Sequence, residues 1–320
     1  MKIAITDYSF PDLTIEDAII SGSGHQLTAW KDKKTPDELC SLVADADAVI
    51  TQFASVSADV IRAMRQAKVI VRYGIGVDNV DLAVARECGI PVCNVPDYCI
   101  DEVADQTLAF ILATTRQVVS NSDFVKAGRW GLATPLNQMR TLKDLSVGLV
   151  GFGRIGREVV SRLRFFKCRI LVHDPLAAAS DIIAAGATPT SLEDVLTQSD
   201  VISLHCPSTS ETRGLLNSET LAQTRPGVII INVARGDLVD PAALTSALTS
   251  GHVAAAALDV FSPEPIPVDH PILKMSNVIV ASHIASVSVP AVRKLRETVA
   301  NIAVMALKGQ TLPNVVNGVR

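Results

Sequence analysis

The sequence has few aromatic residues, which make up 4% of its 320 residues, whereas 48% are hydrophobic. Ala, Val, Ile and Leu must therefore fill the core, and this composition suits parallel sheets covered by helices. Only 19% of the residues are charged, which excludes a disordered chain. The length is enough for two domains with full-sized cores.

The sequence also lacks any block of Lys or Arg, and its net charge is −4. This excludes the basic patch that a nucleic acid or an anionic membrane requires. No apolar run reaches the length of a membrane span. The N-terminal segment MKIAITD meets an aspartate too early for a signal peptide, and we expect that the final VVNGVR leaves no room for a regulatory domain.

None of the six cysteines forms a C-x-x-C pair, and most lie in or beside apolar segments. This pattern favours buried free thiols over a disulfide framework or a redox motif. It indicates a reducing compartment, so we expect a cytoplasmic protein. We expect no metal site.

Short apolar runs alternate with helical patterns along the first hundred residues. This alternation predicts a doubly wound parallel sheet. The expected strands are 2–6, 25–30, 47–51, 68–74 and 90–95, and the expected helices are 37–46, 57–67 and 81–89. A long helix is expected to follow over 101–119, with Val103, Thr107, Phe110 and Ile111 on one face.

The alternation restarts at Ser146 and predicts a second unit of the same class. The expected strands are 146–152, 168–174, 200–206, 227–233, 254–260 and 277–282. The expected helices are 154–166, 180–187, 191–199, 218–224 and 241–251, and a terminal helix is expected over 290–309.

A glycine motif follows the first strand of the second unit, in LVGFGRIGREVV. Gly151, Gly153 and Gly156 have the spacing G-x-G-x-x-G. A purely structural turn is the alternative, but the place of the motif between a strand and a helix favours a dinucleotide loop. Asp174 ends the next strand, where a carboxylate binds ribose hydroxyls and repels a 2′-phosphate. NAD is therefore the expected cofactor, although Asp174 could instead cap a helix.

Three later strands of this unit are followed by polar side chains that suit catalysis. The carboxyl ends of parallel strands meet at one edge of a sheet, where ligands bind. We therefore expect Arg235, Asp259, Glu264 and His283 to converge there. Taken singly, Arg235 could be a turn residue, Glu264 a loop charge and His283 a structural histidine.

At these residues the sequence resembles the D-isomer-specific 2-hydroxyacid dehydrogenase family over essentially its whole length. VRYGIGVDNVDL, GLVGFGRIGREV, INVARGDLVDPAAL, AALDVFSPEP and SHIAS resemble the family's motifs in order and spacing, and CNVPDYCIDEVADQTLAFIL is similar to its C-terminal-binding-protein corepressors. The resemblance implies a flavodoxin-like substrate domain of residues 1–100 and 286–320. It also implies a Rossmann NAD-binding domain of residues 101–285, through which relatives form homodimers.

The resemblance implies a role for each catalytic residue. Arg235 would bind the substrate carboxylate with a planar fork that stays charged. His283 would exchange the hydroxyl proton while hydride moves between C2 and NAD. Glu264 would hydrogen-bond the imidazole, fix its tautomer and favour its charged form. Asp259 would set the electrostatics beside the nicotinamide.

The resemblance also implies a set of cofactor contacts. These are Gly151, Gly153, Arg154, Ile155, Gly156, Asp174, Thr107, His205, Cys206, Pro207, Thr212, Val233, Ala234, Asp259 and Ala285. The other histidines are read as structural.

A second anchor for the substrate carboxylate is expected in the first domain, at Tyr73, Gly74, Ile75 and Gly76. Their backbone N–H groups lie at a strand end, and the glycines permit an anion-binding turn. An ordinary βα turn is the alternative. If the anchor is functional, the substrate lies between the domains, with hinges near Asp101 and residues 284–287.

Two positions depart from the family's pattern: Ser282 replaces a usual Pro, and Val287 replaces an aromatic found in some relatives. In addition, Gln52 and Phe53 lie at the expected pocket edge, and phosphoglycerate dehydrogenases tend to carry Arg nearby. A phosphorylated substrate is therefore not favoured.

We expect an NAD-dependent dehydrogenase that acts on a small 2-hydroxy or 2-keto acid. An NAD-sensing corepressor-like protein is the alternative. Formate dehydrogenase is disfavoured because that group carries Gln at the position of Glu264.

Overall fold

The computed structural model describes residues 1–32 and 34–319. They form two compact units, Met1–Tyr98 with Ser288–Arg320 (unit 1) and Cys99–Val287 (unit 2). The sequence placed the two boundaries after residues 100 and 285, two residues from the observed breaks.

Unit 1 contains a parallel sheet of five strands. Their order is β2-β1-β3-β4-β5, which is the flavodoxin-like arrangement. The strands are β1 (Lys2–Ile5), β2 (Gln26–Ala29), β3 (Ala48–Thr51), β4 (Ile70–Arg72) and β5 (Val92–Cys93).

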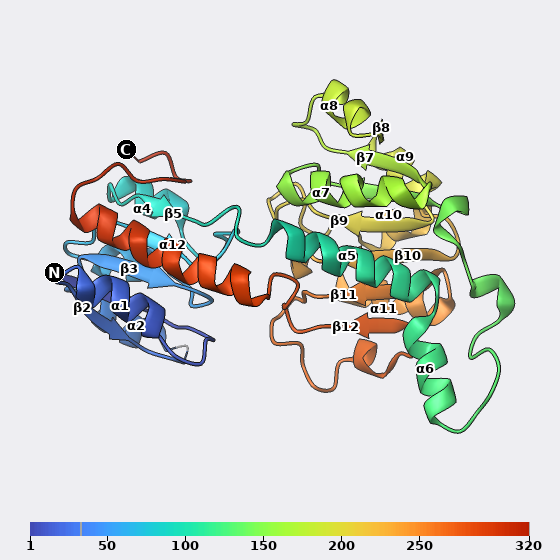
Figure 1. The fold of residues 1–320 in the computed structure, drawn as a ribbon, viewed down its shortest axis with the longest axis horizontal. Coiled ribbons are helices and arrows are strands. Elements are labelled where there is room, and N and C mark those ends of the chain that lie inside the picture. Colours follow the sequence, from blue (N-terminus) through green and yellow to red (C-terminus); the bar gives the residue numbers. More distant parts are fainter. Residues whose placement is uncertain (33, 320) are drawn as a thin grey trace. The chain divides into compact units, whose positions relative to one another are not determined.

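Helices cover both faces of this sheet (Figure 1). On one face, α12 packs beside α1 and buries Leu295, Val299 and Ile302 against the strands. Helix α1 was not predicted from the sequence, because its buried Glu16 interrupts the apolar pattern. The helices are α1 (Thr14–Gly22), α2 (Pro36–Val43), α3 (Ala58–Ala63), α4 (Leu82–Glu87) and α12 (Val289–Leu307).

Unit 2 contains a parallel sheet of seven strands in the order β12-β11-β10-β9-β6-β7-β8. Read from β8, this is the Rossmann order with one additional strand. The strands are β6 (Ser146–Val150), β7 (Arg169–His173), β8 (Thr188–Pro189), β9 (Val201–Leu204), β10 (Val228–Asn232), β11 (Val253–Leu258) and β12 (Val278–Val280). The predicted fold class is therefore confirmed.

The predicted helix over 101–119 is wrong in its length. The observed α5 ends at Thr115, and α6 begins at Val118 after Gln117, whose φ of 52° is left-handed and breaks the helix. The helices of unit 2 are α5 (Ile100–Thr115), α6 (Val118–Lys126), α7 (Arg154–Leu163), α8 (Ala179–Ala184), α9 (Leu192–Gln198), α10 (Ser218–Gln223) and α11 (Pro241–Ser250). Short 3-10 turns are η1 (Leu136–Gln138), η2 (Leu142–Asp144), η3 (Arg164–Phe166), η4 (Gly236–Leu238) and η5 (Pro271–Lys274).

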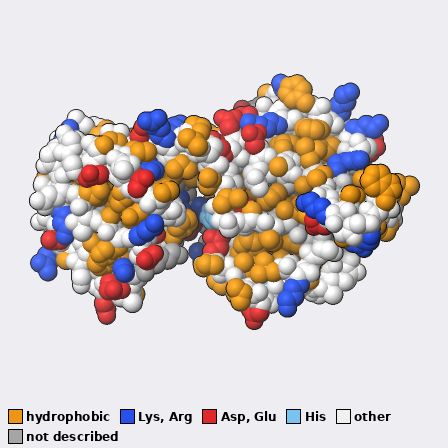
Figure 2. Space-filling view, turned by 60° about the horizontal axis from the view of Figure 1, so that its bottom comes forward, with side chains coloured by type: hydrophobic (Ala, Val, Ile, Leu, Met, Phe, Trp, Pro, Cys, Tyr) orange, Lys and Arg blue, Asp and Glu red, His pale blue; other side chains and the backbone are white. Residues whose placement is uncertain are grey.

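Charged side chains of both signs are interspersed on the face that Figure 2 shows. Across residues 1–32 and 34–319, no helix combines the length and apolar character needed to cross a bilayer.

Candidate active site

An imidazole–carboxylate pair lies at the carboxyl edge of the unit 2 sheet. His283 follows β12, and its Nδ1 lies 2.9 Å from Glu264 Oε2. The other carboxylate oxygen, Oε1, accepts a hydrogen bond of 2.8 Å from the Phe261 amide. Burial opposes ionisation of Glu264, but His283, the Phe261 amide and the charge of Arg235 outweigh it and hold the pKa of Glu264 below its usual value. An ionised Glu264 only accepts hydrogen bonds, so Nδ1 of His283 carries the shared proton.

Arg235 is presented by a turn at the end of β10. The side chain of Asn232 spans this turn: its Oδ1 accepts from the Ala234 amide at 3.0 Å, and its Nδ2 donates to the Arg235 carbonyl at 2.8 Å. The guanidinium Nη1 donates to the Ala234 carbonyl at 2.7 Å. Asn232 is buried and was missed by the sequence analysis, although a polar residue ending the run IIIN was a signal.

Asp259 holds the segment that carries His283. Its carboxylate accepts from the amides of Ile284 (2.8 Å) and Ala285 (2.9 Å), and its carbonyl accepts from the His283 amide (2.7 Å). These bonds fix a backbone in which His283 has a left-handed φ of 58°. Burial raises the pKa of Asp259, although the two amides and His283 counteract it.

The role expected for Asp259, which is to set the electrostatics beside the nicotinamide, stays a prediction. Its side chain is buried and both oxygens accept backbone amides. These contacts also position the segment that carries His283.

The turn after Arg235 packs directly against the loop that carries Glu264. A Cβ on Gly236 would overlap the backbone of Phe261, so only glycine allows this approach. This backbone contact therefore fixes the position of the turn that follows Arg235 relative to the loop that carries Glu264.

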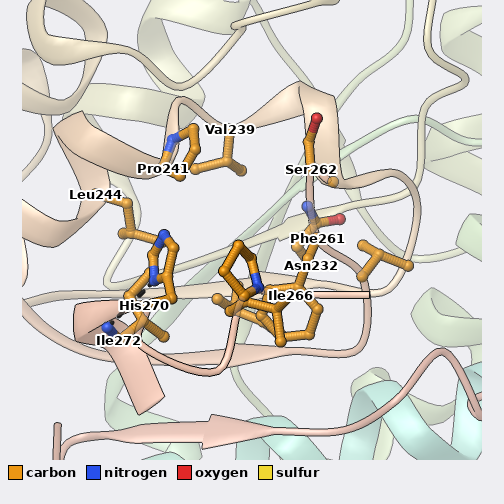
Figure 3. Close-up of a pocket in the computed structure, with 13 residues that line it drawn as sticks. Asn232, Val239, Pro241, Leu244, Phe261, Ser262, Ile266, His270 and Ile272 are labelled. Atoms are coloured by element: carbon orange, nitrogen blue, oxygen red, sulfur yellow. Dashed lines mark hydrogen bonds between the residues drawn. The ribbon is translucent and has the colours of Figure 1, made fainter. Parts of the chain in front are cut away.

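A small cavity of about 30 Å³ lies behind this loop. Figure 3 shows Phe261 and Ile266 on one side and Leu244, His270 and Ile272 on the other. Its volume suits about two water molecules and is far below that of a site for an organic ligand. We regard this cavity as a small gap in the packing beneath the Glu264 loop and not as a ligand site.

The glycine turn fits a dinucleotide on three observations. Gly151 has φ of 106°, and a Cβ there would lie 2.6 Å from the Cys206 amide nitrogen. A Cβ on Gly156 would overlap the Gly151 carbonyl, so the helix packs closely on the turn. By contrast, the Cβ position of Gly153, the N-cap of α7, has no neighbour within 4 Å among the described residues. This open position at an uncapped helix N-terminus suits a phosphate.

Asp174 follows β7 beside this turn. One oxygen accepts from the Phe152 amide at 2.6 Å, and the other accepts from Leu176 and Ala177. Burial raises its pKa less than these three amides lower it, so the pKa of Asp174 lies below its usual value. The carboxylate is thus ionised, and its oxygens keep lone pairs for ribose hydroxyls.

The other predicted cofactor residues fall into two groups. His205, Cys206 and Pro207 follow β9 beside the glycine turn, where burial lowers the pKa of His205 to about 4 and raises that of Cys206 to about 11. The same edge also holds Arg154, Ile155, Thr212, Val233, Ala234 and Ala285. Thr107 differs, because it is fully buried in α5 and its hydroxyl donates to the Val103 carbonyl. Its contact with the cofactor stays a prediction.

Of the four residues predicted to anchor the substrate carboxylate in unit 1, two have backbone amides that already donate hydrogen bonds within the protein. The amide of Tyr73 donates to Thr51 (2.8 Å) and that of Gly74 to Arg72 (2.9 Å). The amides of Ile75 and Gly76 donate to no group in the part of the chain that the structure describes. Asn94 holds this turn through a hydrogen bond of 2.6 Å to the Ile75 carbonyl.

Comparison with known proteins agrees with this geometry. Residues 108–285 match the family model described as D-isomer specific 2-hydroxyacid dehydrogenase, NAD binding domain. D-3-phosphoglycerate dehydrogenase of Mycobacterium tuberculosis (strain ATCC 25618 / H37Rv) is 36% identical over 97% of this chain, which spans 59% of that enzyme's length. Glyoxylate reductase of Thermofilum pendens is 36% identical over 92% of this chain and 87% of its own length.

A solved structure is similar along the whole chain. D-lactate dehydrogenase from Aquifex aeolicus, complexed with NAD and lactic acid, superposes with a TM-score of 0.89 at 27% identity and covers 99% of both chains. These relatives are dehydrogenases and a reductase, so they do not favour the corepressor alternative. Because the family model covers more than half of the chain and relatives at 36% identity cover nearly all of it, this protein belongs to the D-isomer specific 2-hydroxyacid dehydrogenase family, and unit 2 contains the family's NAD-binding domain.

Proposed function

We propose that this protein catalyses reversible hydride transfer between NAD and a small D-2-hydroxy acid. The observation that carries the proposal is the pairing of His283 with Glu264 at the sheet edge where Arg235 and the glycine turn also lie. A general acid/base, a carboxylate-binding cation and a dinucleotide turn are together what this reaction needs.

His283 moves the proton in this reaction. Bound NAD would accept a hydride from C2 of the hydroxy acid, and NADH would return one to the keto acid. Because Nδ1 donates to Glu264, the neutral ring has its lone pair on Nε2, which takes the hydroxyl proton during oxidation. In the reverse direction the imidazolium gives this proton to the developing alkoxide, and Glu264 stabilises the charged ring.

Arg235 binds the substrate carboxylate. The guanidinium offers two parallel N–H donors and keeps its charge throughout the reaction. In unit 1, the amides of Ile75 and Gly76 are the donors that we propose for the predicted carboxylate anchor.

The residues that would hold NAD are the glycine turn and Asp174. The amides at the start of α7 would bind the pyrophosphate and Asp174 the adenosine ribose. A 2′-phosphate would meet the negative charge of Asp174, which favours NAD over NADP.

We infer that the substrate carries no phosphate. Gln52 stands at the predicted pocket edge, and its side chain is engaged by Ser9, accepting from its amide (2.6 Å) and donating to its hydroxyl (3.0 Å). Glyoxylate, pyruvate and hydroxypyruvate have the chemistry that the remaining donors recognise.

We also propose a homodimer formed through unit 2. Large hydrophobic side chains are exposed on α6 and the segment after it, including Trp130, which is 91% exposed. Hydrophobic side chains gather at the right-hand end of the view in Figure 2, where this segment lies. A patch of this kind is typical of an interface. The cytoplasmic location expected from the cysteines stays a prediction.

The test is NADH oxidation with glyoxylate, hydroxypyruvate, pyruvate, phenylpyruvate and 3-phosphohydroxypyruvate. We expect turnover with at least one unphosphorylated acid, and His283→Ala should lower kcat by about 10²–10⁴ while NADH affinity is kept. Absence of turnover with every acid would refute the proposed reaction. Turnover with the phosphorylated acid alone would refute the inferred substrate class.

A further inference from the structure

A buried ion pair in unit 1 joins two helices that are far apart in the sequence. Glu16 on α1 has an exposed fraction of 0%, and Arg296 on α12 has one of 6%. Arg296 Nε lies 2.9 Å from Glu16 Oε1, and Nη2 lies 2.6 Å from Oε2. Nη2 also donates to the Asp12 carbonyl at 2.7 Å, and the guanidinium lies 5.0 Å from the Phe10 ring.

Tyr73 is the third member of this network. Its hydroxyl donates to Glu16 Oε1 at 3.0 Å, and its ring, which is 2% exposed, packs edge-on against Phe10 at 5.3 Å. Burial and the charge of Glu16 raise the pKa of Tyr73 well above its usual value, so the phenol remains a donor. One carboxylate thus receives both the guanidinium and the phenol.

The network is connected to the turn of Ile75 and Gly76 by the backbone of Tyr73. The Tyr73 amide donates to the Thr51 carbonyl, and the next residue, Gly74, has φ of 146°. The Tyr73 side chain therefore fixes where this turn leaves β4. Asn94 fixes its other end at the Ile75 carbonyl.

Stability alone does not account for an ion pair in this core. Two charges lose their hydration on burial, and a hydrophobic pair of similar volume is often as stable or more so. What such a pair does supply is one defined geometry, because its hydrogen bonds are directional.

We propose that Glu16 and Arg296 are positioning residues that act through Tyr73. They hold the Ile75–Gly76 amides in the orientation that binds the substrate carboxylate. This inference rests on the proposed function for its substrate, and on the contacts above for the positioning.

The first test is Tyr73→Phe, which removes one hydroxyl and keeps the ring. We expect the KM for the best keto acid to rise about tenfold, with kcat changed less than about twofold and NADH affinity unchanged. The matched control is Tyr8→Phe, since Tyr8 packs against the same core but, among the described residues, its hydroxyl makes no hydrogen bond to Glu16, Arg296 or Tyr73. Its KM should stay at the wild-type value.

The second test replaces the ion pair by an apolar pair, Glu16→Leu with Arg296→Met. This double variant should fold with a melting temperature near or above that of wild type, and its KM should rise as in Tyr73→Phe. A stable double variant with wild-type KM would overturn the inference, and the proposed function would stand.

Hydrogen–deuterium exchange gives a readout that needs no turnover. Amide exchange at residues 74–77 should be faster in both variants and unchanged in Tyr8→Phe. If the wild-type enzyme turns over no keto acid, the proposed function fails. The positioning role of Glu16 and Arg296 is then tested by amide exchange at residues 74–77 alone. Faster exchange would then support the positioning, and unchanged exchange would overturn it.

Discussion

At the scale of single residues, two carboxylates of unit 2 have different contacts and different pKa shifts because their surroundings differ. Glu264 is 33% exposed and bonds an imidazole, whereas Asp259 is buried and accepts only backbone amides. The pKa is lowered for Glu264 and raised for Asp259, where burial dominates. The environment therefore separates a carboxylate that bonds the imidazole of His283 from one that shapes the backbone.

Asp259→Asn should impair His283 without removing it. A carboxamide accepts through one oxygen only, so the amide of Ile284 or Ala285 would face an NH₂ group. We expect a loss of stability of about 1–3 kcal/mol and a fall in kcat of at least about tenfold, measured by urea unfolding and NADH kinetics. The matched control is Asp181→Asn, whose ion pair with Arg157 is exposed. Wild-type kcat in Asp259→Asn would contradict the positioning role.

The lowered pKa of Glu264 makes the stability of the wild-type protein depend on pH in acid. The pKa of Glu264 is lower in the folded than in the unfolded protein. Its contribution to the free energy of unfolding is therefore complete above about pH 5 and is lost as the pH falls through the folded pKa. Glu264→Gln has no carboxyl group to titrate there. We expect its melting temperature to fall less than that of wild type between about pH 5 and pH 3. If the melting temperatures of both proteins fell in parallel with pH, the pKa of Glu264 would be the same in the folded and unfolded states, which would contradict the prediction.

At the scale of elements, the site depends on where strands and helices end. The turn after β6 places Gly153 at the start of α7, and the turns after β10, β11 and β12 place Arg235, Asp259 and His283. Each turn is fixed by local hydrogen bonds or by a glycine that lets two backbones approach.

Gly153→Ala should separate folding from cofactor binding. Gly153 has φ of −70°, and its Cβ position is open, so alanine fits the protein itself. The methyl group would occupy the space proposed for a phosphate. We expect NADH to bind at least about tenfold more weakly with an unchanged melting temperature, measured by fluorescence titration. Gly22→Ala, also at an open position, is the control and should bind NADH like wild type.

Much of the fold could be predicted from the sequence, because parallel strands are short apolar runs that end in polar residues. The strands β6, β7, β9, β10 and β11 are clear for this reason. The two-residue β8 was missed because it carries no such run. The break at Gln117 was missed because its left-handed backbone has no glycine to mark it.

The site was predictable in part. The sequence motifs indicated Arg235, Glu264 and His283, to which we assign the chemistry in the proposed function. Asn232 was missed although its contacts with Ala234 and Arg235 are local. The positioning contacts of Asp259 were missed because they join it to Ile284 and Ala285, which only the fold brings near. The same reason hid Glu16 and Arg296, which are 280 residues apart in the chain.

At the scale of the whole molecule, a second copy would cover the exposed hydrophobic segment of unit 2. The side chains concerned belong to one stretch of the chain and include Val118, Val119, Val125, Trp130, Leu132 and Leu136. Burying them against a copy of the same surface removes apolar area from water.

The proposed homodimer predicts that Trp130→Glu with Leu136→Glu yields a monomer. The charges would have to be buried unpaired in the interface. Sedimentation velocity measures the mass of each form. The control is Ile183→Glu, an exposed hydrophobic position on α8 outside this segment, which should remain dimeric. A wild-type protein that sediments as a monomer would contradict the proposed assembly.

Unit 1 is built from both ends of the chain, and this affects the order of events on the ribosome. The first 98 residues emerge early, but the helix that covers one face of their sheet is translated only after residue 288. The nascent polypeptide must keep that face exposed while residues 99–287 are synthesised and complete their own core. We expect stalled chains ending before residue 288 to be cleaved by protease within residues 1–98 and protected within 99–287. Protection of both regions would show that the early segment closes its core without its last helix.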